Sequence, residues 1–261
     1  MIPLEKIAAF LQQFAPAALA EEWDNVGLLI GDPARPVERL MTCLTITPVT
    51  VAEAIQARAD LVVSHHPFLF RAVRRVTAET SAGRMLLDLV AARIAVYSPH
   101  TALDSAPRGI NQQLAAALKL RGVTPLLTAD SGRATGRWGW LEVPIALADL
   151  AQRVRRFLAI PALQIVGSPE RPVRTVAVAC GAAGELLERA IQLGCDAMVV
   201  GELRFHACLE AEAAAVGLVL PGHYASERFA LEQLAAVLSQ QFPQIEVWAS
   251  RQERDPLAWV T

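Results

Sequence analysis

Short apolar runs and stretches of helical periodicity alternate along most of the chain. Apolar runs of strand length occupy residues 40–46, 60–64, 94–98, 173–179, 196–200 and 218–220. Apolar residues at helical spacing mark residues 1–14, 48–57, 81–92, 109–118, 184–193, 204–216 and 226–241. Thr47 directly precedes the second of these segments and is the expected N-cap. Strands that alternate with short helices predict βαβ units and a largely parallel sheet.

The second half of the chain repeats patterns of the first. Residues 54–63 match residues 190–199, and residues 113–116 match residues 233–236, in the same order. Alanine-rich helices resemble one another by chance, but matches that keep their order indicate a duplication. We therefore expect an α/β protein made of two related halves, with largely parallel or mixed sheets and a metal site in the cleft between them. The expected domains are residues 1–126 with 222–261, and residues 127–221.

Histidines and carboxylates recur in a fixed pattern. The chain contains Pro99-His100-x-x-x-Asp104 and later Gly222-His223-x-x-x-Glu227, so that the two histidines and the two carboxylates correspond. An apolar run also ends in Ser64-His65-His66-Pro67. Imidazoles and carboxylates are the ligands of borderline divalent metals such as Zn, Mn, Fe, Co or Ni. The pattern predicts a metal site.

His65 and His66 follow an apolar strand and precede a proline. Neighbours on a regular strand point to opposite faces, and Pro67 turns the strand into a loop, so that each ring can reach its own metal. The alternative is a pair of polar residues that only end a strand. Asp104 is expected on a strand-to-helix loop, as a ligand or as an ordinary turn aspartate.

His223 and Glu227 share one face if their segment is helical, and Glu227 is long enough to bridge two metals. The alternative is a loop histidine beside a glutamate that favours the helix dipole. His100 is a candidate to orient Asp104 or to contact substrate. His206 is a candidate for substrate contact or for structure only. Glu202 has the chemistry of a general base or acid.

Composition and charge narrow the class of protein. The formal net charge of −2 disfavours a nucleic-acid-binding surface. Residues 71–75 hold three arginines, either in a solvated loop or as an anion-binding rim. The N-terminus does not resemble a signal peptide, no apolar run approaches the roughly 18 residues that span a bilayer, and the four cysteines show no C-x-x-C spacing. We expect buried free thiols and a cytoplasmic location.

Five segments in this order resemble one protein family. They are Glu22-Trp23-Asp24-Asn25-Val26-Gly27-Leu28, Ser64-His65-His66-Pro67, His100-Thr101-Ala102-Leu103-Asp104, Gly201-Glu202 and Gly222-His223-Tyr224-Ala225-Ser226-Glu227. The chain is similar over nearly its whole length to the NIF three-like family, also described as GTP cyclohydrolase 1 type 2 homologues or dinuclear metal centre hexameric proteins. It resembles the short form, which has no extra domain in the middle.

The resemblance implies two divalent metals per subunit and a toroidal homohexamer. Its metal ligands match His65, His66, Asp104, His223 and Glu227. Two positions depart from the family. Thr45 stands where an aspartate is common, and Cys180 where a small residue is usual. Neither is a ligand, but Thr45 removes a carboxylate near the expected substrate.

These observations lead to two functional hypotheses. The first is a metal-dependent hydrolase of a small molecule, acting on the C–N bond of a purine nucleotide if the family's cyclohydrolase label applies. Glu202, His100 and His206 are then the candidates to move a proton, and residues 23–25 form a substrate-facing loop or an N-terminal cap with a buried tryptophan. The second is a non-catalytic metal-loaded scaffold or regulatory partner protein. A membrane partner is not expected, and a nucleic acid is disfavoured by the charge.

Overall fold

The computed structural model describes residues 1–71, 73–128 and 134–258, and it divides into two compact units. Unit 1 comprises Met1–Leu103 and Ala230–Arg254. Unit 2 comprises Asp104–Phe229 and the described residues from Asp255 onward. Two helices, α4 (His100–Ser105) and α9 (His223–Gln241), contribute residues to both units.

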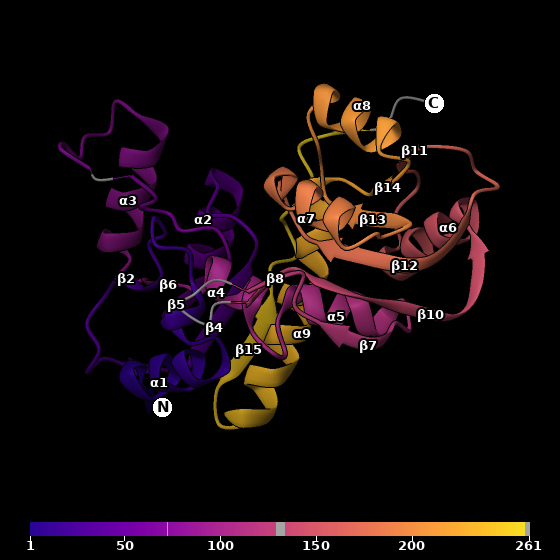
Figure 1. Ribbon diagram of the computed structural model, residues 1–261. Helices are drawn as coiled ribbons and strands as arrows, with labels where there is room; N and C mark the ends of the chain where they lie inside the picture. The colour runs from indigo at the N-terminus through magenta and orange to yellow at the C-terminus, as the bar shows by residue number, and fades with distance from the viewer. Residues whose placement is uncertain (72, 129–133, 259–261) are drawn as a thin grey trace. The chain divides into compact units, whose positions relative to one another are not determined.

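Unit 1 is built on a five-stranded sheet (Figure 1). Its strands, in spatial order, are β15 (Glu246–Ala249), β4 (Arg39–Cys43), β5 (Leu61–Ser64), β6 (Ala95–Ser98) and β2 (Gly27–Ile30). The first four are parallel to one another, and β2 is antiparallel to β6. Every residue of β5 and β6 is buried, as expected for central parallel strands covered on both faces.

The remaining elements of unit 1 are short. They are β1 (Ile2–Pro3), α1 (Leu4–Phe14), a 3₁₀ turn (Ala17–Leu19), β3 (Pro36–Val37), α2 (Pro48–Gln56) and α3 (Ser81–Ala91). The predicted N-cap is confirmed, because Thr47 Oγ1 accepts a hydrogen bond from the Thr50 amide at 3.2 Å. Met41, Val62 and Leu89 belong to the apolar core of this unit.

Unit 2 is built on a six-stranded mixed sheet. Its strands, in spatial order, are β11 (Gln164–Val166), β14 (Gly217–Leu220), β13 (Ala197–Val200), β12 (Pro172–Ala179), β10 (Arg137–Ala146) and β7 (Arg121–Thr124). Strands β12, β13 and β14 are parallel, whereas β11, β10 and β7 pair antiparallel. The predicted mixed α/β class is confirmed.

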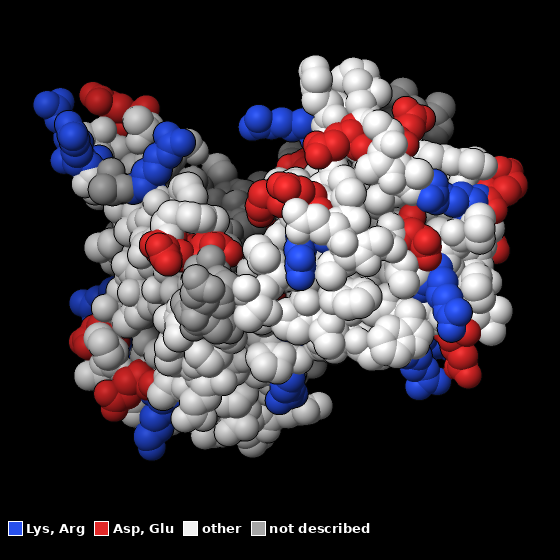
Figure 2. All heavy atoms as spheres, viewed as in Figure 1, with Lys and Arg blue, Asp and Glu red and all other residues white. Residues whose placement is uncertain are grey.

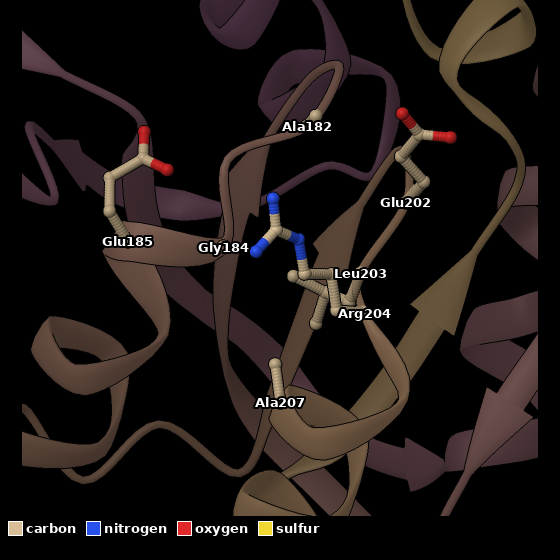
Figure 3. Close-up of a pocket in the computed structure, with 7 residues that line it drawn as sticks. All are labelled: Ala182, Gly184, Glu185, Glu202, Leu203, Arg204 and Ala207. Atoms are coloured by element: carbon tan, nitrogen blue, oxygen red, sulfur yellow. The ribbon is translucent and has the colours of Figure 1, made fainter.

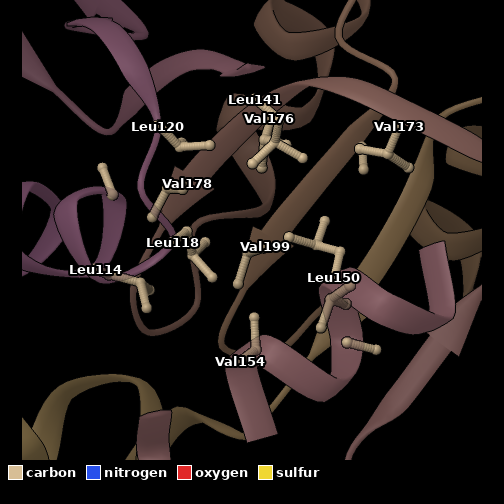
Figure 4. Packing of buried hydrophobic residues seen from close by; sticks show 14 of the residues in the cluster. Leu114, Leu118, Leu120, Leu141, Leu150, Val154, Val173, Val176, Val178 and Val199 are labelled. Carbon is tan, nitrogen blue, oxygen red and sulfur yellow. The ribbon is translucent and has the colours of Figure 1, made fainter. Parts of the chain in front are cut away.

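Helices and a small ribbon complete unit 2. They are α5 (Ile110–Ala117), β8 (Leu127–Thr128), β9 (Ala134–Thr135), α6 (Leu147–Leu158), a 3₁₀ turn (Gly184–Leu186), α7 (Leu187–Gln192) and α8 (Phe205–Ala213). One core cluster holds the apolar faces of α5 and α6 against the sheet, with Leu114, Val154 and Val176 among its buried members (Figure 4). Since α5 packs here, residues 104–126 group with unit 2. Residues 222–229 and 255–258 group with unit 2 as well, whereas all of these residues were predicted to belong to the first domain.

The same hydrogen-bonding arrangement occurs in both units, at Asp60 in unit 1 and at Asp196 in unit 2. The Asp60 carboxylate accepts from the amides of Glu38 and Arg39, at 2.8 and 3.0 Å. Asp196 accepts from the amides of Arg174 and Thr175, at 2.9 and 2.8 Å. Asp60 and Asp196 occupy corresponding positions in the matched segments, which supports the predicted duplication; the duplication stays a prediction.

Several regions differ from the sequence-based expectation, among them the strands β2, β7, β11 and β15, for which no element was predicted. Asp104 does not lie on a loop, because residues 100–105 form the short helix α4, which is too brief for a periodic pattern to reveal. The sequence analysis also assigned no element to residues 137–158, which form β10 and α6. The buried residues Leu147, Leu150 and Val154 do have helical spacing, so the signal for α6 was present.

Positive and negative side chains are mixed on the face drawn in Figure 2, in keeping with the small net charge of the chain. Among the described residues, no helix combines the length and apolarity that crossing a bilayer requires.

Arg137 is a buried charged residue of unit 2 that makes several hydrogen bonds. The residue is only 4% exposed, and burial lowers the pKa of its guanidinium. The guanidinium donates to the carbonyl oxygens of Ser105 and Ala106 at 2.8 and 3.1 Å, and to that of Gly136 at 2.6 Å. It therefore fixes the end of α4 to the start of β10.

We predict that Arg137→Met lowers the free energy of unfolding by about 2–4 kcal/mol, because buried carbonyl oxygens lose their donor. Urea denaturation checks this. The exposed Arg156 of α6 supplies the matched control, and Arg156→Met should change stability by less than about 0.5 kcal/mol. Equal stability of the two variants would contradict the role given to Arg137.

Candidate metal centre

Three histidines of unit 1 meet at the carboxyl end of its parallel sheet. His65 and His66 follow β5, and His100 begins α4 directly after β6. One ligand nitrogen from each of the three lies within 4.8 Å of the others. His65 is completely buried and His66 partly so. The sequence analysis placed His65 and His66 correctly at a strand end, and the fold adds His100 to them.

The ring of His66 is held by Thr45. Thr45 Oγ1 lies 2.7 Å from His66 Nδ1, in the loop that follows the neighbouring strand β4. With Nδ1–H as the donor, Nε2 keeps the lone pair that a metal needs. Thr45 itself is fixed, because its amide donates to Glu253 Oε1 at 2.7 Å. The residue that departs from the family pattern thus contacts a candidate ligand.

His100 is held in the same way by a carboxylate. Its Nδ1–H donates to Asp24 Oδ1 at 2.7 Å, and Asp24 also accepts from the Thr101 amide at 3.2 Å. Burial raises the pKa of Asp24, but hydrogen bonds from His100 and Thr101 outweigh burial and leave that pKa below its ordinary value. These bonds stabilise the positive φ of 30° at His100, which non-glycine residues rarely adopt.

Asp104 of unit 2 lies beside Cys180. The Cys180 thiol donates to Asp104 Oδ1 at 3.1 Å, at the end of β12. Asn111 connects the same two residues, because its side chain donates to the Asp104 carbonyl at 3.1 Å and accepts from the Cys180 amide at 2.7 Å. Burial raises the pKa of Cys180 well above its ordinary value, and the charges of Asp104 and Glu227 raise it further. Negative charge therefore gathers around this thiol.

His223 and Glu227 lie one turn apart in the first part of α9. His223 Nε2 is 3.2 Å from Glu227 Oε2, and Glu227 is 4% exposed. His223 Nδ1–H donates to Glu202 Oε1 at 3.0 Å. The hydrogen bond with Glu227 is the largest cause that raises the pKa of His223 to about 9; burial opposes it, and both carboxylate charges reinforce it. A cation is thus favoured between these carboxylates, either as a proton or as a metal ion.

Gly181 leaves room for the Glu227 carboxylate. It follows Cys180 with a φ of +62°, and a Cβ at this position would overlap Glu227 Oε1. The Gly181 amide donates to Ser226 Oγ at 2.9 Å, and Ser226 Oγ donates to the His223 carbonyl at 2.8 Å. The turn after β12 is therefore bound to the first turn of α9, which fixes where His223 and Glu227 stand.

A cavity of about 620 Å³ opens in unit 2 beside these residues (Figure 3). It lies after the carboxyl ends of β12 and β13 and is lined by Ala182, Gly184, Glu185, Glu202, Leu203, Arg204 and Ala207. The Arg204 guanidinium extends across it, as Figure 3 shows. Because Glu202 both lines the cavity and bonds His223, a molecule in the cavity would lie next to a candidate metal ligand.

The remaining predictions from the sequence, on His206, Trp23 and the cysteines, had different outcomes. His206 is exposed in the first turn of α8, packs edge-on against Phe205, and joins no group of three or more ligand-type side chains in the described chain. Trp23 is 60% exposed, so the reading of a buried tryptophan in an N-terminal cap is wrong. The cysteines are free, and three of the four are buried.

Four supporting residues were missed by sequence reasoning as partners of the site. Thr45 and Asp24 hold histidine rings, Asn111 fixes Asp104, and Gly181 makes room for Glu227. The family motifs include Asp24 and draw attention to Thr45, and Gly181 lies two residues after a predicted strand, but none of these signals indicated a contact with a ligand. Thr45, Asp24 and Gly181 act on residues that are 21 or more positions away in the sequence.

The donor set fits a divalent metal. Three imidazoles have an oxygen on Nδ1, which directs Nε2 to an ion, as is usual for metal-ligating histidines. In unit 2, the carboxylates of Asp104 and Glu227 carry negative charge and the oxygen atoms that a divalent ion could use as ligands. Nitrogen and oxygen donors of this kind suit Zn, Mn, Fe, Co or Ni.

Comparison with known proteins agrees with the family resemblance of the sequence motifs. The profile of a family described as Duf34/NIF3 (NGG1p interacting factor 3) matches residues 2–256. A Streptomyces coelicolor protein named GTP cyclohydrolase 1 type 2 homolog is 36% identical over 231 residues, or 86% of this chain and 81% of the relative. NIF3-like protein 1 of Drosophila melanogaster is 32% identical over 267 residues, or 98% and 90% of the two chains.

Solved structures share the fold. A Bacillus cereus protein related to NIF3 aligns with a TM-score of 0.92 at 20% identity, over 100% of this chain and 99% of that one. Reduced HcgD from Methanocaldococcus jannaschii aligns with a TM-score of 0.85 at 26% identity, over 95% and 97%. The resemblance found in the sequence motifs is confirmed, and the chain belongs to the DUF34/NIF3 family.

Proposed function

We propose that this protein binds two divalent metal ions and hydrolyses a small molecule. The observation that carries the proposal is the oxygen atom at hydrogen-bonding distance from Nδ1 of His66, His100 and His223, since an acceptor at this place leaves the opposite nitrogen of each ring for a metal. Polar groups converge in this way at sites that bind ions or react.

Five side chains would hold the ions: His65 and His66 from unit 1, and Asp104, His223 and Glu227 from unit 2. Glu227 would bridge them, because its carboxylate offers two oxygens. When bound, two divalent ions supply Lewis acidity and lower the pKa of coordinated water towards neutrality.

The other residues would act on protons and orientation. Glu202 holds the His223 ring and faces the cavity, so it can both position that ligand and carry a proton to or from a bound molecule. His100, held by Asp24, can orient a substrate group or move a proton next to His65 and His66. The relatives' name, GTP cyclohydrolase 1 type 2 homolog, suggests a C–N bond of a purine nucleotide as the bond hydrolysed.

From the family resemblance we also propose a cytoplasmic homo-oligomer, with a toroidal hexamer as the expected form.

We predict two divalent ions per chain in purified protein, measured by elemental analysis. His65→Ala should lower the metal content, and Glu227→Ala should remove most of both ions because one carboxylate serves both. Glu210→Ala, on α8, is the control and should keep the wild-type content. Full occupancy in the Glu227→Ala protein would exclude the bridging role.

A second prediction concerns the hydroxyl behind His66. Thr45→Ala should weaken metal binding by about 10-fold, because the ring loses the acceptor that fixes its tautomer. Thr45→Asp should restore or tighten binding, since a carboxylate is a stronger acceptor. Competitive titration against a metal-sensitive dye measures both, with the exposed Thr124→Ala as control. An unchanged affinity in Thr45→Ala would show that the hydroxyl has no part in metal binding.

The third prediction concerns catalysis, tested by a hydrolysis screen over nucleotides, cyclic phosphates and amides. Activity should vanish with a chelator and return with Mn, Zn or Co. Glu202→Gln should keep the metals but slow turnover by roughly 10²-fold, because an amide cannot carry the proton. Unchanged turnover would limit Glu202 to positioning His223. Bound metal without any turnover across the screen would instead favour the second candidate, a metal-loaded scaffold or regulatory protein.

A further inference from the structure

Two large aromatic side chains of unit 1 are exposed beside the histidines. Trp23 is 60% exposed and Phe70 is 49% exposed. Their ring centroids lie 5.7 Å apart at an interplanar angle of 71°. Both rings also lie against His100, with centroid distances of 6.1 and 6.4 Å. The pair therefore borders the same histidine that approaches His65 and His66.

The loops that carry these rings are fixed by polar contacts. Asn25 Nδ2 donates to the Leu69 carbonyl at 2.7 Å and so joins the two loops. The Asn25 amide donates to Asp24 Oδ1 at 2.8 Å, and the Asp24 amide donates to the Glu21 carbonyl at 3.0 Å. Because Asp24 also holds His100, one network fixes the aromatic pair and the histidine together.

We infer that Trp23 and Phe70 form a stacking surface for a planar heteroaromatic ring of the substrate, held next to His100. The two adjacent rings form one apolar patch, and covering that patch removes apolar surface from water. A planar ring covers a fixed aromatic pair at little entropic cost, through face or edge contacts that all aromatic rings can make. The inference rests on the proposed function in one respect: the bound ring would lie next to the proposed metal centre.

The size of the surface favours a small molecule over a protein partner. A stable protein interface buries about 800 Å² on each partner, several times what two side chains can offer. The surface also adjoins ligand-type histidines, which a substrate must reach and a structural contact need not.

The test follows the indole N–H signals of ¹⁵N-labelled protein during titration with adenosine, guanosine or ribose. The chain has five tryptophans, and Trp23→Phe identifies the Trp23 signal. We expect both nucleosides to shift this signal and ribose to leave it unchanged. Trp23→Ala and Phe70→Ala should each weaken nucleoside binding by about 5- to 100-fold, the range that one ring–base stack contributes.

Two controls separate this surface from other exposed aromatics. Phe205→Ala removes a 71% exposed ring, and Trp140→Phe trims a 41% exposed one, both in unit 2. Both variants should bind the nucleosides as the wild type does. If Trp23→Ala does not fold, two measurements still test the stacking surface. They are the nucleoside affinity of the conservative Trp23→Phe variant and the shift of the Trp23 indole signal in the wild type.

The titration is repeated on metal-free and metal-loaded protein. Nucleoside binding at Trp23 without metal supports the stacking surface even if the proposed metal function fails. Wild-type affinity in Trp23→Ala, or shifts confined to other tryptophans, would overturn it. A changed molar mass of Trp23→Ala by light scattering, with unchanged nucleoside affinity, would also overturn it and would assign the pair to a contact between subunits.

Discussion

The candidate site depends on one repeated interaction, an oxygen held within hydrogen-bonding distance of histidine Nδ1. Thr45, Asp24 and Glu202 provide this oxygen for His66, His100 and His223. An imidazole without such a partner rotates about two side-chain bonds and exchanges tautomers, and both freedoms must be lost when it binds an ion. The acceptor removes them in advance. Its identity, hydroxyl or carboxylate, also sets how strongly each ring donates electrons to a metal.

Both units place these residues by the same structural logic. Parallel strands end at one edge of a sheet, and the loops and helix starts that follow them gather side chains there. In unit 1 the strands are β5 and β6, followed by His65, His66 and His100. In unit 2 they are β12, β13 and β14, followed by Cys180-Gly181, Glu202 and His223. Chemistry thus concentrates at strand ends, while the apolar cores behind them keep the backbone in place.

Local pattern revealed the elements where the signal was long enough. The buried strand β5 and the capped helix α2 follow from periodicity and from Thr47. The shared face of His223 and Glu227 was predicted only on the condition that their segment is helical, and α9 meets that condition. The helix of His100 and Asp104 was missed because six residues give no period. Whether Trp23 is buried was left open, because the burial of a loop residue depends on what packs over the loop.

The sequence by itself determined the α/β class, the family and the chemistry of the candidate ligands, because residue type and short-range spacing carry that information. Only the tertiary structure decided which groups support those ligands. Asp24 and His100 are 76 residues apart, and Thr45 reaches His66 across 21 residues from a neighbouring strand. No local pattern encodes such pairs, since they form only when the sheet aligns strand ends that are distant in the chain. From the sequence, Thr45 appeared only as a lost carboxylate. The tertiary structure shows that its side chain contacts His66.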